Sequence, residues 1–373
     1  MSDEKNPDLN SLERLLLGLL AIPSVIGNEQ DIRLFCEEYL SRIGADEVVV
    51  AGDNLAFRPR PWTKGKPKLL LLGHLDTVPS QGENPPRVEG DRIFGLGASD
   101  MKGGDALILD LCKRAVLEEP KVDLGFVLYA REEGPYADSG MPEIVASAPA
   151  YFSDVSLAIA MEPTNGQWEL GCLGTMHAEV RIKGQAAHSA RPWLGHNAIH
   201  AAGPLLEALR NLPAREIEFH GLRFQEVLSA TMVSFEGARN VIPPSCTLNL
   251  NFRFGPDRSI DDAKAWLEAF VGDKLQSEEF ELEWKDLCPS GRVCGDNTVL
   301  QQIEASAGGS LTRKAKQAWT DVGRLSAMGM DAVNLGPGDT SEAHQKNESC
   351  SRHILRECRS LFHRYLFGSE ARD

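Results

Sequence analysis

The sequence predicts an α/β protein built on a doubly wound, mixed to mostly parallel sheet, with a second α+β domain inserted into it. Short continuous apolar runs are typical of strands buried on both faces of such a sheet, and they occur at 69–72, 124–130, 155–161 and 332–335. Apolar residues recur at helical spacing over 32–43, and 101–117 reads as a further helix. Strands and helices that alternate in this way predict the doubly wound architecture.

The middle of the chain has a different order of strand and helix patterns, which predicts the inserted domain. Strand patterns occur at 177–184, 228–235, 247–254 and 280–287, and helix patterns occur at 197–212 and 259–272. Their order, β-α-β-β-α-β, is the split unit of a ferredoxin-like sandwich. We therefore expect residues 1–175 and 289–373 to form the main domain and residues 176–288 to form the insertion.

Composition excludes several classes of protein. A formal net charge of −15 and the lack of a Lys/Arg run argue against a nucleic-acid partner. No apolar run approaches the length of about 20 residues that spans a bilayer, so we expect no membrane partner and a cytoplasmic location. The eight cysteines show no CxxC spacing and are expected to be reduced core and surface thiols.

Side chains that can bind metal follow the predicted strands. Because ligands bind beyond the carboxyl ends of parallel strands, the residues directly after each apolar run are the first candidates. Two histidines and five carboxylates occupy such places or the glycine-rich stretch before the second helix: His74, Asp76, Asp100, Glu132, Glu133, Glu162 and His344. Any one acidic residue here would ordinarily be a helix cap or a solvated loop charge. Together they would repel one another without a cation, and imidazole with carboxylate suits zinc.

Five segments carry a family resemblance. They are GHLDTVP at 73–79, GLGASDMKGG at 95–104, REEG at 131–134, MEPT at 161–164 and EAHQKNE at 342–348. In this order they resemble the motifs of the zinc aminoacylase and carboxypeptidase family, and the resemblance covers nearly the whole chain. It implies two zinc ions, for which cobalt can substitute. Asp100 would bridge them, His74 and Glu162 would bind one ion, and Glu133 and His344 would bind the other.

The resemblance also assigns three catalytic roles. It makes Glu132 the general base that takes a proton from water, and Asp76 the partner that orients His74. A lone histidine such as His188 would ordinarily be a surface or cap residue. In the family, the histidine of this motif reaches the active site of the other subunit of a homodimer and stabilises the oxyanion. His177, His196 and His200 match no catalytic position of the family and are expected to be structural.

Four further residues bear on the substrate. Asn240, Arg253, Thr320 and Arg324 lie in segments that resemble the NVIP, LRF and TSDGRF segments of bacterial succinyl-diaminopimelate desuccinylases. Guanidinium groups bind carboxylates in a planar bidentate geometry, which suits a small anionic N-acyl amino acid, although either arginine alone would as readily be a surface ion pair. The chain departs from these segments by Arg239 before Asn240 and by TDVGRL in place of TSDGRF.

The resemblance therefore implies hydrolysis of N-succinyl-L,L-2,6-diaminopimelate to succinate and diaminopimelate, towards lysine and peptidoglycan. Another N-acyl amino acid deacylase, such as an acetylornithine deacetylase, or a metallo-carboxypeptidase is the alternative within enzymes. A non-catalytic binding protein of the same fold is the alternative outside them. Such a protein should have lost Glu132 or several ligands, and the sequence has lost none.

Overall fold

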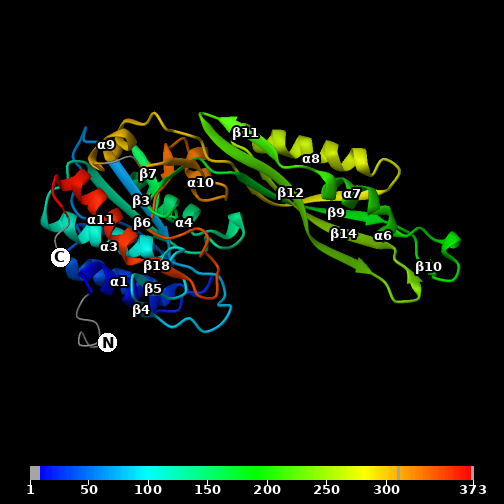
Figure 1. Ribbon diagram of the computed structural model, residues 1–373, viewed down its shortest axis with the longest axis horizontal. Helices are drawn as coiled ribbons and strands as arrows, with labels where there is room; N and C mark the ends of the chain where they lie inside the picture. The colour runs from blue at the N-terminus through cyan, green and yellow to red at the C-terminus, as the bar shows by residue number, and fades with distance from the viewer. Residues whose placement is uncertain (1–8, 309–310, 371–373) are drawn as a thin grey trace. The chain divides into compact units, whose positions relative to one another are not determined.

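The computed structural model describes residues 9–308 and 311–370 and divides into two compact units (Figure 1). The first unit comprises residues up to Leu170 with Cys294–Lys314 and the C-terminal segment from Met328. The second comprises Gly171–Val293 and Ala315–Ala327. The second unit is thus wider than the insertion predicted at 176–288, and it takes in a short segment that the sequence places in the main domain. Within the described part of the chain, no helix combines the length and apolarity needed to cross a membrane.

An eight-stranded mixed sheet forms the centre of the first unit. Its order is β1-β2-β6-β3-β7-β17-β8-β16. The four predicted strands, β3 (Lys68–His74), β6 (Asp123–Tyr129), β7 (Leu157–Ala160) and β17 (Ala332–Asn334), are neighbours in this sheet and run parallel. The flanking strands are β1 (Glu47–Ala51), β2 (Asn54–Arg58), β8 (Trp168–Leu170) and β16 (Arg313–Ala315). Every residue of β3 and β6 is buried, which confirms that continuous apolar runs mark strands covered on both faces.

Helices cover this sheet. The longer ones are α1 (Ser11–Leu20), α2 (Gln30–Ile43), α3 (Lys102–Leu117), α9 (Thr298–Ser306) and α11 (Arg352–Phe367), with α4 (Met141–Ser147) and α5 (Pro149–Phe152) shorter. α3 packs on β3, α1 and α11, as Figure 1 shows for the blue, cyan and red helices. A capping box between Asn10 and Glu13 starts α1. The buried Glu13 carboxylate also pairs with Arg352 and Arg356, which ties α1 to α11 because a buried charge needs a partner.

A small three-stranded sheet completes the first unit beside the predicted metal residues. Its order is β18-β5-β4, with β4 (Arg87–Glu89), β5 (Arg92–Phe94) and β18 (Ser349–Ser351). β18 follows the 342–348 motif directly and pairs with β5. These three-residue strands are too short to show a periodic pattern in the sequence, so they were not predicted.

The second unit carries a five-stranded antiparallel sheet with helices on one face. The sheet order is β11-β12-β14-β9-β15, and its strands are β9 (Gly174–Lys183), β11 (Arg215–Phe219), β12 (Leu222–Glu236), β14 (Ser245–Phe254) and β15 (Phe280–Cys288). All four predicted strands are present, and β11 is an additional edge strand. The single helix predicted over 197–212 is wrong: α6 (Ala198–Ala201) and α7 (Gly203–Asn211) divide at Ala202, directly before a Gly-Pro pair. α8 (Ile260–Lys274) begins at a capping box on Ser259.

Side-chain alternation gives this sheet one apolar and one polar face. On β9, the residues Met176, Ala178, Val180 and Ile182 point into a core shared with α6, α7 and α8. The residues between them point to the opposite face. The core also contains Cys246, and all eight cysteines of the chain are free and buried, so the expected surface thiols are absent.

Candidate metal centre

The parallel strands bring the predicted ligands to one edge of the first unit's sheet. His74 is the last residue of β3, Glu132 and Glu133 follow β6, and Glu162 follows β7. Since β6, β3 and β7 are adjacent and parallel, their carboxyl ends lie side by side. The order of the strands therefore places these four side chains together.

Asp100 lies between the two histidines. One carboxylate oxygen, Oδ1, is 3.3 Å from Nε2 of His74, and the other, Oδ2, is 3.4 Å from Nε2 of His344. Nε2 of His344 is also 2.9 Å from Oε1 of Glu133. A carboxylate whose two oxygens face two different imidazoles has the arrangement that a bridging ligand needs.

Three groups of side chains have ligand atoms within 4.8 Å of one another. The first contains His74, Asp100 and Glu162, the second contains Asp100, Glu133 and His344, and the third contains His74, Glu132 and Glu133. The first two share Asp100 and coincide with the two ligand sets expected from the sequence. Their donors, imidazole nitrogen and carboxylate oxygen, suit zinc and cobalt, so the residues present fit a pair of divalent cations.

The electrostatics of the cluster are those of opposite charges held close together. Burial disfavours the charged form of His74, but the hydrogen bond with Asp100 and the charges of Asp76 and Glu132 raise its pKa well above the ordinary value. Hydrogen bonds with Asp100 and Glu133 raise the pKa of His344 to about 10. Burial would raise the pKa of Asp100, but its bonds with the two histidines lower it overall. The centre therefore stabilises positive charge, as a cation site must.

Asp76 contacts more than the histidine it was expected to orient. Nδ1 of His74 is 3.0 Å from the backbone oxygen of Asp76 and 3.6 Å from its carboxylate. The carboxylate accepts hydrogen bonds from the backbone N–H groups of Glu132 (3.0 Å) and Glu133 (2.9 Å). The backbone oxygen thus accepts the imidazole N–H, while the fully buried carboxylate holds the Glu132–Glu133 turn.

Glu348 positions the segment that carries Asp100. Its Oε1 accepts hydrogen bonds from the backbone N–H groups of Ser99 (2.8 Å) and Asp100 (2.9 Å), and its Oε2 accepts one from Gly97 (2.8 Å). Burial raises the pKa of Glu348 to about 7, although these three bonds oppose the rise. Glu348 is the last residue of the 342–348 motif, and its role was not predicted from the sequence.

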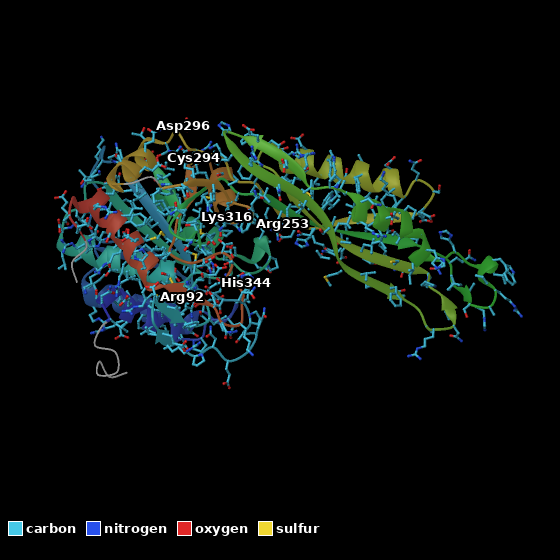
Figure 2. All side chains as sticks on the ribbon, viewed as in Figure 1. Arg92, Arg253, Cys294, Asp296, Lys316 and His344 are labelled. Atoms are coloured by element: carbon cyan, nitrogen blue, oxygen red, sulfur yellow. The ribbon has the colours of Figure 1, made fainter. Side chains whose placement is uncertain are left out.

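The segment that carries His344 is braced separately. Arg92 donates to Oγ of Ser349 at 3.0 Å and pairs with Glu342, whose Oε2 also accepts the backbone N–H of Ser349 at 2.9 Å. Figure 2 labels Arg92 and His344 in this part of the first unit. The His344 side chain itself is half exposed, so the centre is open to solvent on that side.

His188 and Asn240 lie together in the second unit. In a two-stranded ribbon formed by β10 (Ala187–His188) and β13 (Val241–Ile242), His188 pairs with Val241. The backbone N–H of Ser189 donates to the backbone oxygen of Asn240 at 2.9 Å. Nδ1 of the exposed His188 ring accepts the backbone N–H of Ala190 at 3.0 Å. A neutral ring with an accepting Nδ1 carries its proton on Nε2, which is the state needed to donate to an oxyanion.

Arg253, Thr320 and Arg324 also belong to the second unit. Thr320 and Arg324 are buried, and Nε of Arg324 donates to Oδ1 of Asp321 at 2.7 Å, so this ion pair is not on the surface. Asp321 is the acidic residue of the altered TDVGRL segment. Burial and the Asp286 carboxylate raise the pKa of Cys288, while the guanidinium groups of Arg324 and Arg253 oppose the rise. Both arginines therefore lie within electrostatic reach of the same thiol.

Comparison with known proteins gives relatives over nearly the full chain. The model of peptidase family M20/M25/M40 matches residues 70–367. A Mycobacterium tuberculosis protein, provisionally named a succinyl-diaminopimelate desuccinylase, is 37% identical over 95% of this chain and 97% of its own length. A Corynebacterium glutamicum succinyl-diaminopimelate desuccinylase is 33% identical over 98% of this chain and 100% of its own.

Solved structures share the fold. A tripeptidase from Staphylococcus aureus has a TM-score of 0.76 at 20% identity and covers 94% of this chain and 96% of its own. A Bacillus subtilis protein described as a dinuclear metal-binding peptidase has a TM-score of 0.71 at 16% identity, and the match covers 94% of this chain and 95% of the Bacillus chain. At these identities the likeness concerns architecture.

Proposed function

The chain belongs to peptidase family M20/M25/M40 and is a metal-dependent hydrolase of that family; from this premise we propose that it hydrolyses N-succinyl-L,L-2,6-diaminopimelate. The products are succinate and L,L-diaminopimelate, and the reaction serves lysine and peptidoglycan synthesis. The desuccinylase relatives at 33% and 37% identity support this choice of substrate. The free, buried cysteines accord with a cytoplasmic location, which we propose as well.

One observation carries the hydrolytic proposal: Asp100 is shared by two ligand triads, and Glu132, which is in neither of these two, groups with His74 and Glu133 beside them. We assign His74, Asp100, Glu133, Glu162 and His344 as ligands of two zinc ions. When bound, the ions supply Lewis acidity that polarises an amide carbonyl and raises the acidity of water. Glu132 takes the proton of the attacking water and delivers it to the leaving amine. The Asp76 carboxylate holds the turn that positions this base.

Arg253 and Arg324 are the proposed carboxylate-binding residues, with Asn240 and Thr320 as polar partners of the substrate. The substrate is an anion with carboxylates at both ends, and a guanidinium can bind each one with two parallel hydrogen bonds. Arg324 is already oriented by Asp321 at 2.7 Å. The acidic residue that differs from the desuccinylase segments thus has a specific function here, as the anchor of Arg324.

His188 is the proposed oxyanion donor, supplied by the partner subunit of a homodimer. The second unit has a surface suited to such pairing. The Leu222–Glu226 part of β12 pairs with β11, but over residues 227–236 no strand among the described residues covers that edge. Met232 (70%), Val233 (64%) and Phe235 (62%) are exposed there, and an open edge with apolar side chains favours pairing with another chain.

A substrate panel tests the proposal. The purified, zinc-loaded protein is assayed in parallel against N-succinyl-L,L-diaminopimelate, N-acetylornithine and simple dipeptides, and kcat/KM is measured for each. We expect a clear preference for the succinyl substrate. A preference for N-acetylornithine or for dipeptides would refute the proposed succinyl substrate, but the protein would still be a hydrolase. No turnover of any substrate by fully loaded protein would favour the non-catalytic alternative.

A further inference from the structure

We propose that His177 is a positioning residue for substrate binding, which acts through Asn251 to fix the orientation of the Arg253 guanidinium. The inference rests on the proposed function, because it takes Arg253 as a group that binds a substrate carboxylate. It gives a purpose to a histidine for which the sequence offers no catalytic match. It also names the polar face of the inserted sheet as the part of the second unit that controls recognition of the anion.

A chain of hydrogen-bonding side chains crosses three neighbouring strands, β12, β14 and β9, which Figure 1 shows side by side in the second unit. Nε of Arg253 donates to Oδ1 of Asn251 at 3.0 Å. The Asn251 amide nitrogen is 2.7 Å from Nε2 of His177, which lies directly opposite Asn251 in the register. Nδ1 of His177 is 3.1 Å from the side-chain amide nitrogen Nδ2 of Asn249, and the same nitrogen is 2.6 Å from Oγ1 of Thr231.

The donors and acceptors of this chain permit one consistent arrangement. A guanidinium can only donate, so the amide oxygen of Asn251 faces Arg253 and its NH₂ group faces His177. Nε2 of His177 must therefore accept, and the neutral ring carries its proton on Nδ1. That N–H needs an acceptor, which the amide oxygen of Asn249 provides, because the oxygen and nitrogen of an amide exchange places by a half-turn. Thr231 then donates its hydroxyl to the same oxygen.

Arg253 differs from Arg324 in what holds it. Arg324 has the carboxylate of Asp321 at 2.7 Å. Over residues 9–308 and 311–370, Arg253 has no carboxylate within ion-pair distance, and its bond to Asn251 is its one hydrogen bond. Burial lowers the pKa of Arg253, while Cys288 and Asp286 oppose this. Arg253, labelled in Figure 2, is a half-buried cation whose terminal nitrogens form no hydrogen bond or ion pair among the described residues, so it is suited to bind an anion. The neutral Asn251–His177 pair orients it without neutralising it.

The Asn251 amide is neutral and contacts only Nε of Arg253, so it orients the guanidinium and leaves the charge and the terminal nitrogens to the substrate. Without the anchor, the long Arg253 side chain would have to be ordered at the moment of binding, at a cost in conformational entropy. Removal of His177 should therefore raise KM more than it lowers kcat. Because the hydrogen bond lost joins two neutral groups, the His177 ring and the Asn251 amide, we expect kcat/KM to fall by about 3- to 10-fold.

The test is a double-variant cycle on the zinc-loaded full chain with N-succinyl-L,L-diaminopimelate. The variants are Arg253→Ala, His177→Met and the combination, and each is checked for zinc content and thermal unfolding. We expect His177→Met to lose kcat/KM in the wild-type background and to lose almost nothing further once Arg253 is alanine. Additive losses would show that His177 has only a general structural role and would overturn the inference.

A matched pair of substitutions provides a second measurement. His177→Gln keeps one acceptor and one donor, as the neutral imidazole does, while His177→Met has similar bulk and neither group. We expect His177→Gln to retain clearly more kcat/KM than His177→Met, and equal values would contradict the relay. If Arg253 does not bind the substrate, as the proposed function requires, Arg253→Ala alone would leave kcat and KM unchanged. This outcome differs from failure of the relay, in which Arg253→Ala loses kcat/KM and the losses are additive.

Discussion

The two units arrange their candidate residues in different ways. In the first, charged side chains gather where parallel strands end, and each contacts another candidate: Asp100 faces His74 and His344, while the Asp76 carboxylate holds the backbone of Glu132. In the second, Arg253 lies on the face of an antiparallel sheet, His188 lies in a short ribbon, and Arg324 pairs with Asp321 outside both. Arg253 is linked there through neutral amide and imidazole groups.

This difference suggests that the first unit carries out the catalytic reaction and that the second unit mainly binds the substrate. Side chains that share a cation or a carboxylate depend on one another, so a single change in the first unit should lower kcat. Side chains in the neutral hydrogen-bonded row act through Arg253, so changes in this row should affect how well the substrate is bound. The variants of the first unit therefore test whether the reaction occurs, and most variants of the second test with which substrate.

Removal of metal should have the largest effect. Chelation should abolish turnover, because water is a poor nucleophile at neutral pH without a Lewis acid, and added zinc should restore it. Activity and elemental zinc content are followed together during titration with chelator and then with zinc. Full activity in protein shown to be free of metal would contradict the assignment of the first unit as a metal-dependent catalytic centre.

Replacement of the proposed base should come next. Glu132→Gln removes the acceptor of the water's proton, so kcat should fall by about 100- to 10,000-fold while zinc content stays near that of the unchanged chain. Glu133→Gln is the matched variant, one residue further on, and should lose metal as well as rate because Glu133 faces His344 at 2.9 Å. If Glu132→Gln cost less than about tenfold, the base would have to be another group.

His188 tests whether the second unit also takes part in the chemistry. The oxyanion donor is worth about 100- to 1,000-fold, so His188→Ala should be nearly inactive with zinc retained. His196→Ala is the control, because that exposed ring pairs with Glu278 at 2.6 Å within its own unit. Normal kinetics in His188→Ala would limit the second unit to substrate selection.

Mixed dimers then show which subunit supplies His188. When His188→Ala and Glu132→Gln chains are mixed, a donor that acts across a two-fold interface leaves one site with both defects and one with neither. Random pairing should restore about a quarter of the sites. If activity does not return although mass spectrometry shows mixed dimers, the donor does not come from the partner subunit.

The same contrast explains how far the sequence alone could be interpreted. The candidate ligands could be selected because buried parallel strands appear as apolar runs whose carboxyl ends meet at one edge, and the family resemblance then assigned them to two zinc ions. The role of Glu348 could not, since its partners are backbone N–H groups of Gly97, Ser99 and Asp100, about 250 positions away in the chain. Backbone groups leave no side-chain signature in a sequence.

Side-chain contacts in the inserted unit were harder to predict from the sequence, for a different reason. Alternation predicts which residues of β9 and β14 face away from the core, but not which of them meet. The partner of His177 follows from the continuous register of β9 and β14, and the position of Thr231 follows from the bulge in β12 between Ala230 and Met232. The break between α6 and α7 could have been predicted from Gly203-Pro204, because proline lacks the backbone N–H that continues a helix.

The smallest effect expected among these tests concerns Asp76, where sequence and structure give different reasons for the same residue. If the carboxylate acts mainly on His74, Asp76→Asn should weaken zinc binding. The geometry instead places the backbone oxygen of Asp76 at 3.0 Å from the His74 ring, and the substitution leaves that oxygen in place. An asparagine offers one acceptor oxygen and turns an N–H towards the other backbone donor, so the Glu132–Glu133 turn should loosen. We therefore expect kcat to fall by about 10- to 100-fold, the range typical for groups that support a metal ligand or its neighbours, with zinc content unchanged. Asp31→Asn, an exposed change on α2, is the control and should behave as the unchanged chain does. Loss of zinc in parallel with activity would show that the carboxylate acts through His74, and would place Asp76 with the ligands rather than with the base.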